Sequence, residues 1–164
     1  EPIMACYHAI STGKTESAKN AWGTDVPYLQ SVRADGDILS PEVESSVDIT
    51  DEQFKKCAQS LEGAVLSKNR KKWVGNCKTT KSGYVTKIKI GGKDFSGSDV
   101  RSAFALKSPA FTVKKTDKGF HFNVRGYGHL VGMSQYSADY MARQGSGYKD
   151  ILLHFFPGAK LVKP

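Results

Sequence analysis

Residues 111–138 read FTVKKTDKGFHFNVRGYGHLVGMSQYSA, and this stretch does most to decide the fold class. Apolar residues alternate on both sides of Thr116-Asp117-Lys118-Gly119, which predicts a β-hairpin with strands over 111–115 and 120–125. Three glycines follow at a junction from strand to helix, and the residues behind them predict a helix over 134–143. A hairpin that leads directly into a helix favours a fold with both kinds of element.

The flanking sequence adds more short elements. Thr50 and Gln53 have the spacing of a capping box, and apolar residues at i, i+3, i+4 and i+7 behind them predict an amphipathic helix. The further predicted elements are helices over 51–61, 99–106 (capped by Ser98) and 148–155, and strands over 84–90 and 159–162. Elements in this irregular order favour α+β over a regular alternating α/β fold. The sequence therefore predicts an α+β fold with an irregular mixed or antiparallel sheet, β-hairpins and several short helices.

Composition limits the classes of protein to which the chain can belong. Its 164 residues are 39% apolar and 24% charged, which is ordinary for one globular domain or two small ones and argues against disorder and fibres. No run approaches the roughly 20 apolar residues that cross a bilayer. The formal charge of +8 directs long-range attraction toward anionic partners such as nucleic acid, acidic lipid or an anionic cell-wall polymer. No recognised nucleic-acid motif accompanies the charge, so nucleic acid is not a predicted partner.

The chain changes character about a third of the way along. Asp35-Gly36-Asp37 and Ser40-Pro41-Glu42 have the composition of turns and loops at the edge of a domain. An inserted or secondary subdomain is therefore predicted at about 42–108. Within it, the basic stretch Lys68-Asn69-Arg70-Lys71-Lys72-Trp73 has two interpretations: a contact to a polyanion, or a solvated turn with Trp73 in the core.

Small and hydrogen-bonding residues concentrate in two segments, 7–16 and 126–136. The glycines of the second segment have GxGxxxG spacing instead of the GxGxxG of dinucleotide-binding folds, which argues against NAD. A Ser-His-Asp hydrolase could be assembled from Ser11 with His8 or His129, but no GxSxG nucleophile elbow supports it. No CxxC or His-rich spacing suggests a structural metal, so neither a metal nor a cofactor is predicted.

Together, the two segments carry the residues of a known signature. The first reads YHAISTGKT at 7–15 and is followed by WG at 22–23 and PYL at 27–29. The second reads GYGHLVGMSQYSA at 126–138 and is followed by ILLHFFPG at 151–158. In this order they resemble the signature of the stage II sporulation protein D family (SpoIID/LytB domain), and residues 1–164 resemble the C-terminal part of that domain. The chain departs from the family pattern at Ala9, Ile10 and Thr12, and at Leu130 and Ser137, where members usually have glycine.

The resemblance implies a lytic transglycosylase of peptidoglycan. Family members cut the bond between N-acetylmuramic acid and N-acetylglucosamine and leave a 1,6-anhydro end. One carboxyl group protonates the leaving oxygen and then, as carboxylate, accepts the proton of the sugar's own 6-hydroxyl as that oxygen attacks C1. In the family this acid is a glutamate in an upstream stretch with no counterpart here, so the catalytic residue is expected upstream of Glu1. Glu16 is the acid nearest to a family motif, either as a cleft carboxylate or as a solvated or lysine-paired side chain.

Within this chain the resemblance implies residues that support the site. Hydroxyl, amide and imidazole groups would bind the sugar's N-acetyl and hydroxyl groups or orient their neighbours, and glycines would leave room for the glycan. The predicted substrate-binding residues are Tyr7, His8, Ser11, Thr12, Gly13, Thr15, Gly128, His129, Gly132, Ser134 and Gln135. Ser134 has a competing role as the N-cap of the predicted helix. Four other aromatic residues, Trp22, Tyr28, Trp73 and Phe155, are expected to pack in the interior.

Partners and a location are also implied by the resemblance. The expected partners are peptidoglycan glycan strands, an amidase (stage II sporulation protein P) and a membrane scaffold (stage II sporulation protein M). The expected place is outside the cytoplasm, between mother cell and forespore during engulfment, with the protein anchored to the membrane through an upstream helix. Anionic wall polymers there would suit the charge of +8. The alternative, from the LytB branch, is a non-catalytic glycan-binding modifier of a cell-wall amidase.

Cysteine usage leaves the redox state open. Cys6, Cys57 and Cys77 are too few and too scattered for a disulfide framework, so either one bridge with a free thiol or three thiols fit the sequence. In the compartment that the resemblance implies cysteines can pair, and Cys57 with Cys77 is the first pair to test.

Overall fold

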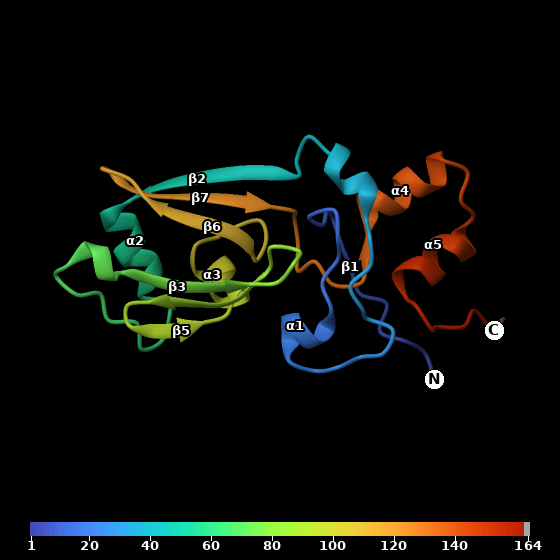
Figure 1. The fold of residues 1–164 in the computed structure, drawn as a ribbon, viewed down its shortest axis with the longest axis horizontal. Helices are drawn as coiled ribbons and strands as arrows, with labels where there is room; N and C mark the ends of the chain where they lie inside the picture. Colours follow the sequence, from blue (N-terminus) through green and yellow to red (C-terminus); the bar gives the residue numbers. More distant parts are fainter. Residues whose placement is uncertain (163–164) are drawn as a thin grey trace. The chain divides into compact units, whose positions relative to one another are not determined.

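The computed structural model describes residues 1–162 and divides the chain into two compact units (Figure 1). Unit 1 combines Glu1–Val43 with Gly126–Pro164, and unit 2 is Glu44–Arg125. Unit 2 is therefore inserted into the sequence of unit 1. Lys163 and Pro164, the last two residues of the predicted domain, lie outside the described residues.

Short elements make up both units. Those of unit 1 are β1 (Tyr7–His8), α1 (Ala18–Trp22), the 3-10 helix η1 (Asp35–Leu39), β8 (Met133–Ser134), α4 (Gln135–Arg143) and α5 (Tyr148–Phe155). Those of unit 2 are β2 (Glu44–Thr50), α2 (Asp51–Ala58), the 3-10 helix η2 (Arg70–Lys72), β3 (Val74–Thr79), β4 (Val85–Ile90), β5 (Lys93–Phe95), α3 (Gly97–Ala103), β6 (Ala110–Lys115) and β7 (Gly119–Arg125). This mixture confirms the predicted α+β fold. No described helix is long and apolar enough to cross a membrane.

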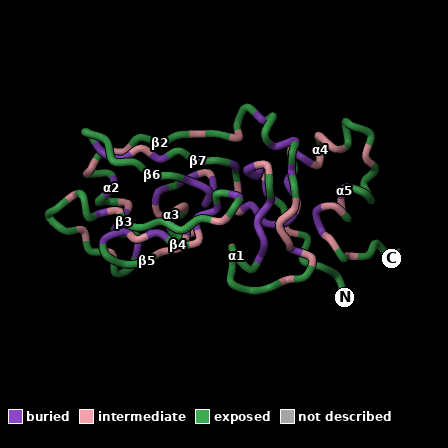
Figure 2. The backbone as a smooth tube through the Cα atoms, viewed as in Figure 1, coloured by how far each residue is buried: buried purple, intermediate pink, exposed green. Residues whose placement is uncertain are grey.

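Unit 2 is built on two three-stranded antiparallel sheets with the orders β2-β7-β6 and β3-β4-β5. Side chains from both sheets and from α2 and α3 join one apolar cluster. Phe54 of α2 lies at its centre, with its ring centroid 4.2 Å from that of Phe120 and 5.7 Å from that of Trp73. Strand β2 has no buried residue and runs along the outside of its sheet (Figure 2). The stability of unit 2 thus rests on aromatic packing.

Unit 1 has little regular sheet and a different interior. Its apolar cluster is smaller and is formed by buried residues of α1, α5 and the loops between them, including Leu29, Val131 and Phe155. Within residues 1–162, all but two of the buried polar or charged side chains belong to this unit, the exceptions being Ser82 and Ser108. Because a buried polar group costs free energy unless it is hydrogen-bonded, unit 1 depends on a specific network of hydrogen bonds.

Most of the predicted elements are confirmed. The hairpin forms as β6 and β7. Helix α2 begins behind the predicted capping box, in which the Thr50 side chain accepts from the Gln53 N–H and the Gln53 side chain accepts from the Thr50 N–H. It ends at Ala58, three residues before the predicted end at 61. Helices α4 and α5 and strand β4 lie within one residue of the predicted bounds. Gly91 and Gly92 make the turn between β4 and β5.

The predicted bounds of α3, 99–106, are wrong at both ends, because the helix spans Gly97–Ala103. Ser96, not Ser98, caps the helix, because Ser96 and Asp99 form a reciprocal capping box. Ser98 lies inside the helix, where its hydroxyl is 3.0 Å from the Tyr84 hydroxyl. Both serines precede an acidic residue at short range, and only the spacing of three residues allows the box.

The predicted closing strand over 159–162 is also wrong. These residues have no regular structure, and the side chains of Leu161 and Val162 are 47% and 83% exposed. A short apolar run predicts a strand only where a partner strand can satisfy its backbone. No described strand pairs with this segment.

The cysteines form no bridge. Cys6, Cys57 and Cys77 are all free thiols, so of the two possibilities that the sequence leaves open the structure has three thiols, and Cys57 and Cys77 are not paired. Cys57 packs against the core of unit 2 from α2, whereas Cys77 is exposed on the outer strand β3. Partial burial of the sulfur atoms raises the pKa of the Cys77 and Cys6 thiols, which disfavours the reactive thiolate.

Unit 2 and the predicted subdomain at 42–108 overlap but end at different residues. The unit continues through the β6–β7 hairpin to Arg125, because β7 is the central strand between β2 and β6. Glu44 at the start of β2 pairs with Arg125 at the end of β7, so the chain enters and leaves unit 2 at neighbouring positions.

Candidate functional site

The two signature segments meet through a short parallel pair of strands in unit 1. Tyr7 pairs with Met133 and His8 with Ser134, although more than 120 residues separate them in the chain. Around this pair, the Tyr127 N–H donates to the Ile10 carbonyl at 2.7 Å and the Glu16 N–H donates to the Leu130 carbonyl at 2.7 Å. The two segments therefore form one structural element.

His8 lies buried in the middle of this element. Its Nδ1 is 3.1 Å from the Val131 carbonyl oxygen, which can only accept, so the neutral ring carries its proton on Nδ1 and leaves Nε2 as an acceptor. Nε2 is buried and has no hydrogen-bond partner among the described residues. Burial lowers the pKa of His8 to about 4, with a smaller contribution in the same direction from His129. His8 is therefore neutral at physiological pH and presents an unused lone pair.

Two more rings continue from His8 toward the surface. The His129 ring lies edge-on to His8 with centroids 5.9 Å apart, and the Trp22 ring lies 5.7 Å from His129. Nδ1 of His129 accepts the Val131 N–H at 3.1 Å, which fixes the orientation of the ring. Trp22 is 44% exposed, so the expectation that it packs in the interior is wrong. An exposed indole next to imidazoles offers a flat face for stacking against a sugar ring.

A buried aspartate joins the two segments from behind. Asp37 of η1 is fully buried and accepts from the Ser11 N–H at 2.7 Å, the Ser134 hydroxyl at 2.6 Å and the Ser137 hydroxyl at 2.8 Å. Ser11 belongs to the first signature segment and both other serines belong to the second. Asp37 therefore holds the two segments together. No local pattern in the sequence marks this residue, because Asp35-Gly36-Asp37 has the composition of an ordinary turn.

Ser137 also explains one departure from the family pattern. Its hydroxyl accepts the Asp37 N–H at 3.0 Å as well as donating to the Asp37 carboxylate. A glycine at this position would supply neither contact. The hydroxyl thus adds a second link between η1 and α4.

The glycines among the predicted substrate-binding residues, Gly13, Gly128 and Gly132, lie in close contact with other parts of the chain. A Cβ on Gly128 would lie 2.7 Å from the His8 Cβ, and a Cβ on Gly132 would lie 2.2 Å from the Cys6 carbonyl oxygen. A Cβ on Gly13 would meet the Ile38 side chain at 2.9 Å. All three glycines have positive φ, between 75° and 112°. The space on the Cβ side of each one is filled by the protein's own chain. Their role in leaving room for a glycan stays a prediction.

Leu130 keeps the backbone of the glycine that it replaces. Its φ is 68°, in the left-handed region, and its side chain is fully buried. The left-handed backbone costs a non-glycine residue about 1–2 kcal/mol, whereas burying a leucine side chain contributes about 1.5–3 kcal/mol. Burial therefore offsets the strain, and the departure at Leu130 leaves the backbone beside His129 in the shape that glycine would favour.

The other predicted site residues divide by exposure. Tyr7 and Gln135 are exposed and can reach a ligand. Thr15 and Ser134 are fully buried and bonded within the protein: the Thr15 hydroxyl accepts the Val32 N–H, and Ser134 caps α4 by accepting the Ser137 N–H. The Thr12 hydroxyl donates to the Lys14 carbonyl at 3.3 Å. A role in ligand binding stays a prediction for each of these residues.

Glu16 is buried, which contradicts the interpretation as a solvated side chain. It is 2% exposed, and its Oε1 accepts from the Ser17 N–H at 2.8 Å and from the Asn20 side chain at 2.9 Å. These contacts tie the carboxylate to the first turn of α1. Glu16 is therefore not a solvated side chain, and a role as a cleft carboxylate stays a prediction.

Two further chemistries find no support in the geometry. The Nδ1 atom of His8 faces the Val131 carbonyl, and Asp37 accepts from the backbone N–H of Ser11, so these residues do not form a Ser-His-Asp arrangement. Over residues 1–162, no group of three or more His, Cys, Asp or Glu residues is arranged to hold a metal ion.

Comparison with known proteins gives named relatives over nearly the whole chain. It is 32% identical over 163 residues to stage II sporulation protein D of Bacillus subtilis (strain 168), covering 98% of this chain and 46% of that protein. It is 33% identical to stage II sporulation protein D of Bacillus amyloliquefaciens, covering 98% and 45%, and 26% identical to an amidase enhancer of Bacillus subtilis (strain 168), covering 98% and 30%.

The chain thus spans less than half the length of these relatives. No family model matches it. The relatives bear out the resemblance read from the two signature segments, and the structure joins those segments around His8. The chain belongs to the stage II sporulation protein D family.

Proposed function

We propose that this chain is part of a peptidoglycan-remodelling lytic transglycosylase that cleaves peptide-stripped glycan strands during engulfment in sporulation. The observation that carries the proposal is the junction of the two signature segments at β1 and β8, with the unused acceptor of His8 beneath His129 and Trp22. The names of the relatives support a role in sporulation and at the cell wall.

The general acid is proposed to come from a part of the protein outside these 164 residues. Glu16 and Asp37, the buried acids next to the signature segments, are both engaged by hydrogen-bond donors of the protein. A general acid must instead lie within hydrogen-bonding reach of the glycosidic oxygen. The upstream glutamate of the family is the proposed residue.

His8 and the exposed aromatic residues are proposed to bind and orient the glycan. A neutral His8, whose Nε2 is covered by this chain, supports the His129 ring from beneath. Trp22 stacks on a sugar face, and Tyr7 and Gln135 supply polar contacts from the surface. In this arrangement the chain positions the sugar while the acid performs both proton transfers, and the 6-oxygen forms the new bond to C1 as the glycosidic bond breaks.

Mass spectrometry of released products tests this proposal. Amidase-stripped glycan is incubated with this chain and, separately, with a version extended upstream. We expect 1,6-anhydro products, which are lighter by one water than hydrolysis products, from the extended version alone. Trp22→Ala in the extended version should reduce product formation at low glycan concentration, while the matched change Tyr148→Ala at an exposed aromatic residue of α5 should not. Hydrolytic products would contradict the proposal.

A second candidate is a non-catalytic, glycan-binding modifier of a cell-wall amidase. The amidase enhancer among the relatives favours it. Retention of glycan by the extended version without any cleavage, together with a change in the rate of an added amidase, would select this candidate.

The partners and place follow from the first candidate. We propose that glycan strands are the substrate and that the amidase (stage II sporulation protein P) and the scaffold (stage II sporulation protein M) act beside this protein. The proposed place is the extracytoplasmic space between mother cell and forespore. The exposed Trp22 and the polar site are suited to a carbohydrate rather than a buried apolar ligand.

A further inference from the structure

The positive charge of the chain belongs to unit 2 alone. This unit holds 17 of the 24 lysine and arginine residues but only 8 of the 16 aspartate and glutamate residues. Its formal charge is therefore +9, against −1 for unit 1. The positive electrostatic potential is therefore concentrated around unit 2, which the net charge of +8 for the whole chain does not reveal.

Two side chains of the basic stretch at 68–73, those of Arg70 and Trp73, contact the rest of unit 2 and fix the stretch in place. The guanidinium of Arg70 donates to Asp51 at 2.6 Å and to the Gly119 carbonyl at 2.6 Å, and it lies over the Phe120 ring. The Trp73 ring is buried, and its N–H donates to the Ser67 carbonyl at 2.7 Å. These anchors fix the loop and leave the lysines between them outside.

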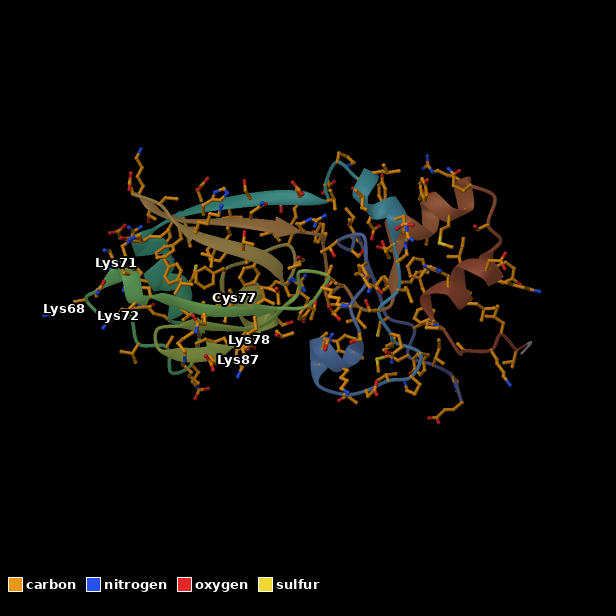
Figure 3. The ribbon with its side chains drawn as sticks, in the orientation of Figure 1. Lys68, Lys71, Lys72, Cys77, Lys78 and Lys87 are labelled. Carbon is orange, nitrogen blue, oxygen red and sulfur yellow. The ribbon has the colours of Figure 1, made fainter. Side chains whose placement is uncertain are left out.

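Five exposed lysines form what we call the lysine face. They are Lys68, Lys71 and Lys72 of the loop, Lys78 of β3 and Lys87 of β4 (Figure 3). Lys78 and Lys87 are directly opposite each other across the two strands, an arrangement in which like charges destabilise a sheet. The sheet thus holds these charges together against their own repulsion.

Few acids neutralise this face. Lys68, Lys71, Lys72 and Lys78 make no ion pair within residues 1–162. Lys87 shares a single carboxylate, Asp94, with Lys89, at 3.5 Å and 3.0 Å respectively. The hydrogen bond from Lys89 and the charges of both lysines lower the pKa of Asp94, as expected in a positive surrounding. The lysine face is left with unpaired positive charge.

The character of the face selects one class of anion. Its free cations are all lysines, which act as point charges toward phosphate. The planar fork of Arg70 is already occupied by Asp51 and the Gly119 carbonyl. In unit 2 the only large apolar side chain that is exposed is Val65, so this surface offers no aromatic ring for base stacking and no apolar wedge for a membrane.

From these observations we infer that the lysine face of unit 2 binds a linear phosphodiester polymer with a sugar- or polyol-based backbone. The polymer lies along β3 and the loop that precedes it, and its phosphates replace the missing acids. Binding of this kind holds the protein on an anionic matrix without involving the site in unit 1. The inference goes beyond the proposed function and does not depend on it.

Salt-dependent binding to poly(glycerol phosphate) tests the inference on the full chain. The variant Lys71→Gln/Lys72→Gln/Lys78→Gln removes three charges of the face, and the matched control Lys19→Gln/Lys149→Gln/Lys160→Gln removes three exposed charges of unit 1. Each lost phosphate contact reduces the slope of log affinity against log salt by about 0.7, so the first variant should lose roughly 2 from the slope and bind at least about tenfold more weakly. The control should bind within about twofold of the wild type.

Three results would overturn the inference: no binding by the wild type, equal losses in both variants, or preference for vesicles of phosphatidylglycerol and phosphatidylcholine over the polymer. Trp73 fluorescence verifies that unit 2 is folded in each variant, because Trp73 lies in its core. A failure of glycan cleavage leaves this measurement unaffected, since no cleavage is required for binding.

Discussion

Unit 1 and unit 2 stabilise themselves in opposite ways. Unit 2 surrounds an aromatic core with a strongly basic surface and has only two buried polar side chains, Ser82 and Ser108. Unit 1 is almost neutral in charge but buries His8, Glu16 and Asp37 together with a set of hydroxyl groups. This difference indicates which part of each unit is suited to function. In unit 1 it is the buried polar network, whose geometry is fixed, and in unit 2 it is the charged surface.

The two tryptophans allow the units to be observed separately. The chain has two, Trp22 in unit 1 and Trp73 in unit 2. Replacing either one by phenylalanine leaves a fluorescence signal that reports on one unit.

The largest expected effect is on the buried network of unit 1. Asp37→Ala leaves the Ser11 N–H and the Ser134 and Ser137 hydroxyls without their acceptor, and each buried unsatisfied group costs about 1–3 kcal/mol. We expect a loss of roughly 3–5 kcal/mol in the free energy of unfolding reported by Trp22 in urea. The exposed control Asp139→Ala, which loses only an ion pair to Arg143, should change it by less than about 0.5 kcal/mol.

A matched change in unit 2 sharpens the same comparison. Phe54→Ala removes the central ring of the aromatic core and should lower the stability reported by Trp73 by about 3–5 kcal/mol. Asp37→Ala should act on the Trp22 signal and Phe54→Ala on the Trp73 signal. If both signals moved together in both variants, the contrast between two separately stabilised units would be lost.

A smaller effect on stability is expected from pH, and it arises from His8 in unit 1. The pKa of His8 is about 4 in the folded state and about 6.5 in an unfolded chain. Between these pH values the unfolded state therefore binds more protons than the folded state. Because of this difference, the free energy of unfolding decreases as the pH falls from about 6.5 to about 4. Between pH 7.5 and pH 5 the loss should be about 2 kcal/mol in the Trp22 transition. His8→Gln should abolish this part of the pH dependence, whereas His121→Gln in unit 2 should leave it in place. A wild type whose Trp22 transition is the same at both pH values would contradict the burial of a neutral His8.

The smallest predicted effect concerns the start of α3 in unit 2. Ser96→Ala removes the side chain that caps the helix and should cost about 1 kcal/mol in the Trp73 transition. Ser98→Ala loses one contact to Tyr84 but gains helix propensity, so its effect should stay within about 0.5 kcal/mol. Urea unfolding of the two variants compares them directly, and a larger loss for Ser98→Ala would return the cap to the position predicted from the sequence.

Local patterns allowed more of unit 2 than of unit 1 to be predicted. The β6–β7 hairpin, the capping box of α2 and strand β4 have alternation or spacing that can be read over a few residues. The outer strands β2 and β3 were not predicted, because β2 alternates only between exposed and half-buried residues and β3 is almost fully exposed.

In unit 1 the resemblance located the two signature segments, but their pairing left no local trace. Strands β1 and β8 have two residues each, which is too few for any periodicity. All of unit 2 lies between these two strands in the sequence. Asp37 could not be singled out, because its role depends on serines about 100 residues away. The burial of Glu16 likewise follows from contacts that spacing does not encode.

The connection between the units has a consequence for how such a chain can be rearranged. Glu44 and Arg125 are paired, and the Gly126 N–H donates to the Val43 carbonyl at 2.8 Å, so the two ends of the insertion are already held side by side. A turn of a few residues could bridge Val43 and Gly126 without stretching the backbone. Unit 2 is thus a cassette: it can be removed, exchanged for a domain with another surface or grafted into a different host at a single splice point, while the strands that hold His8 keep their register.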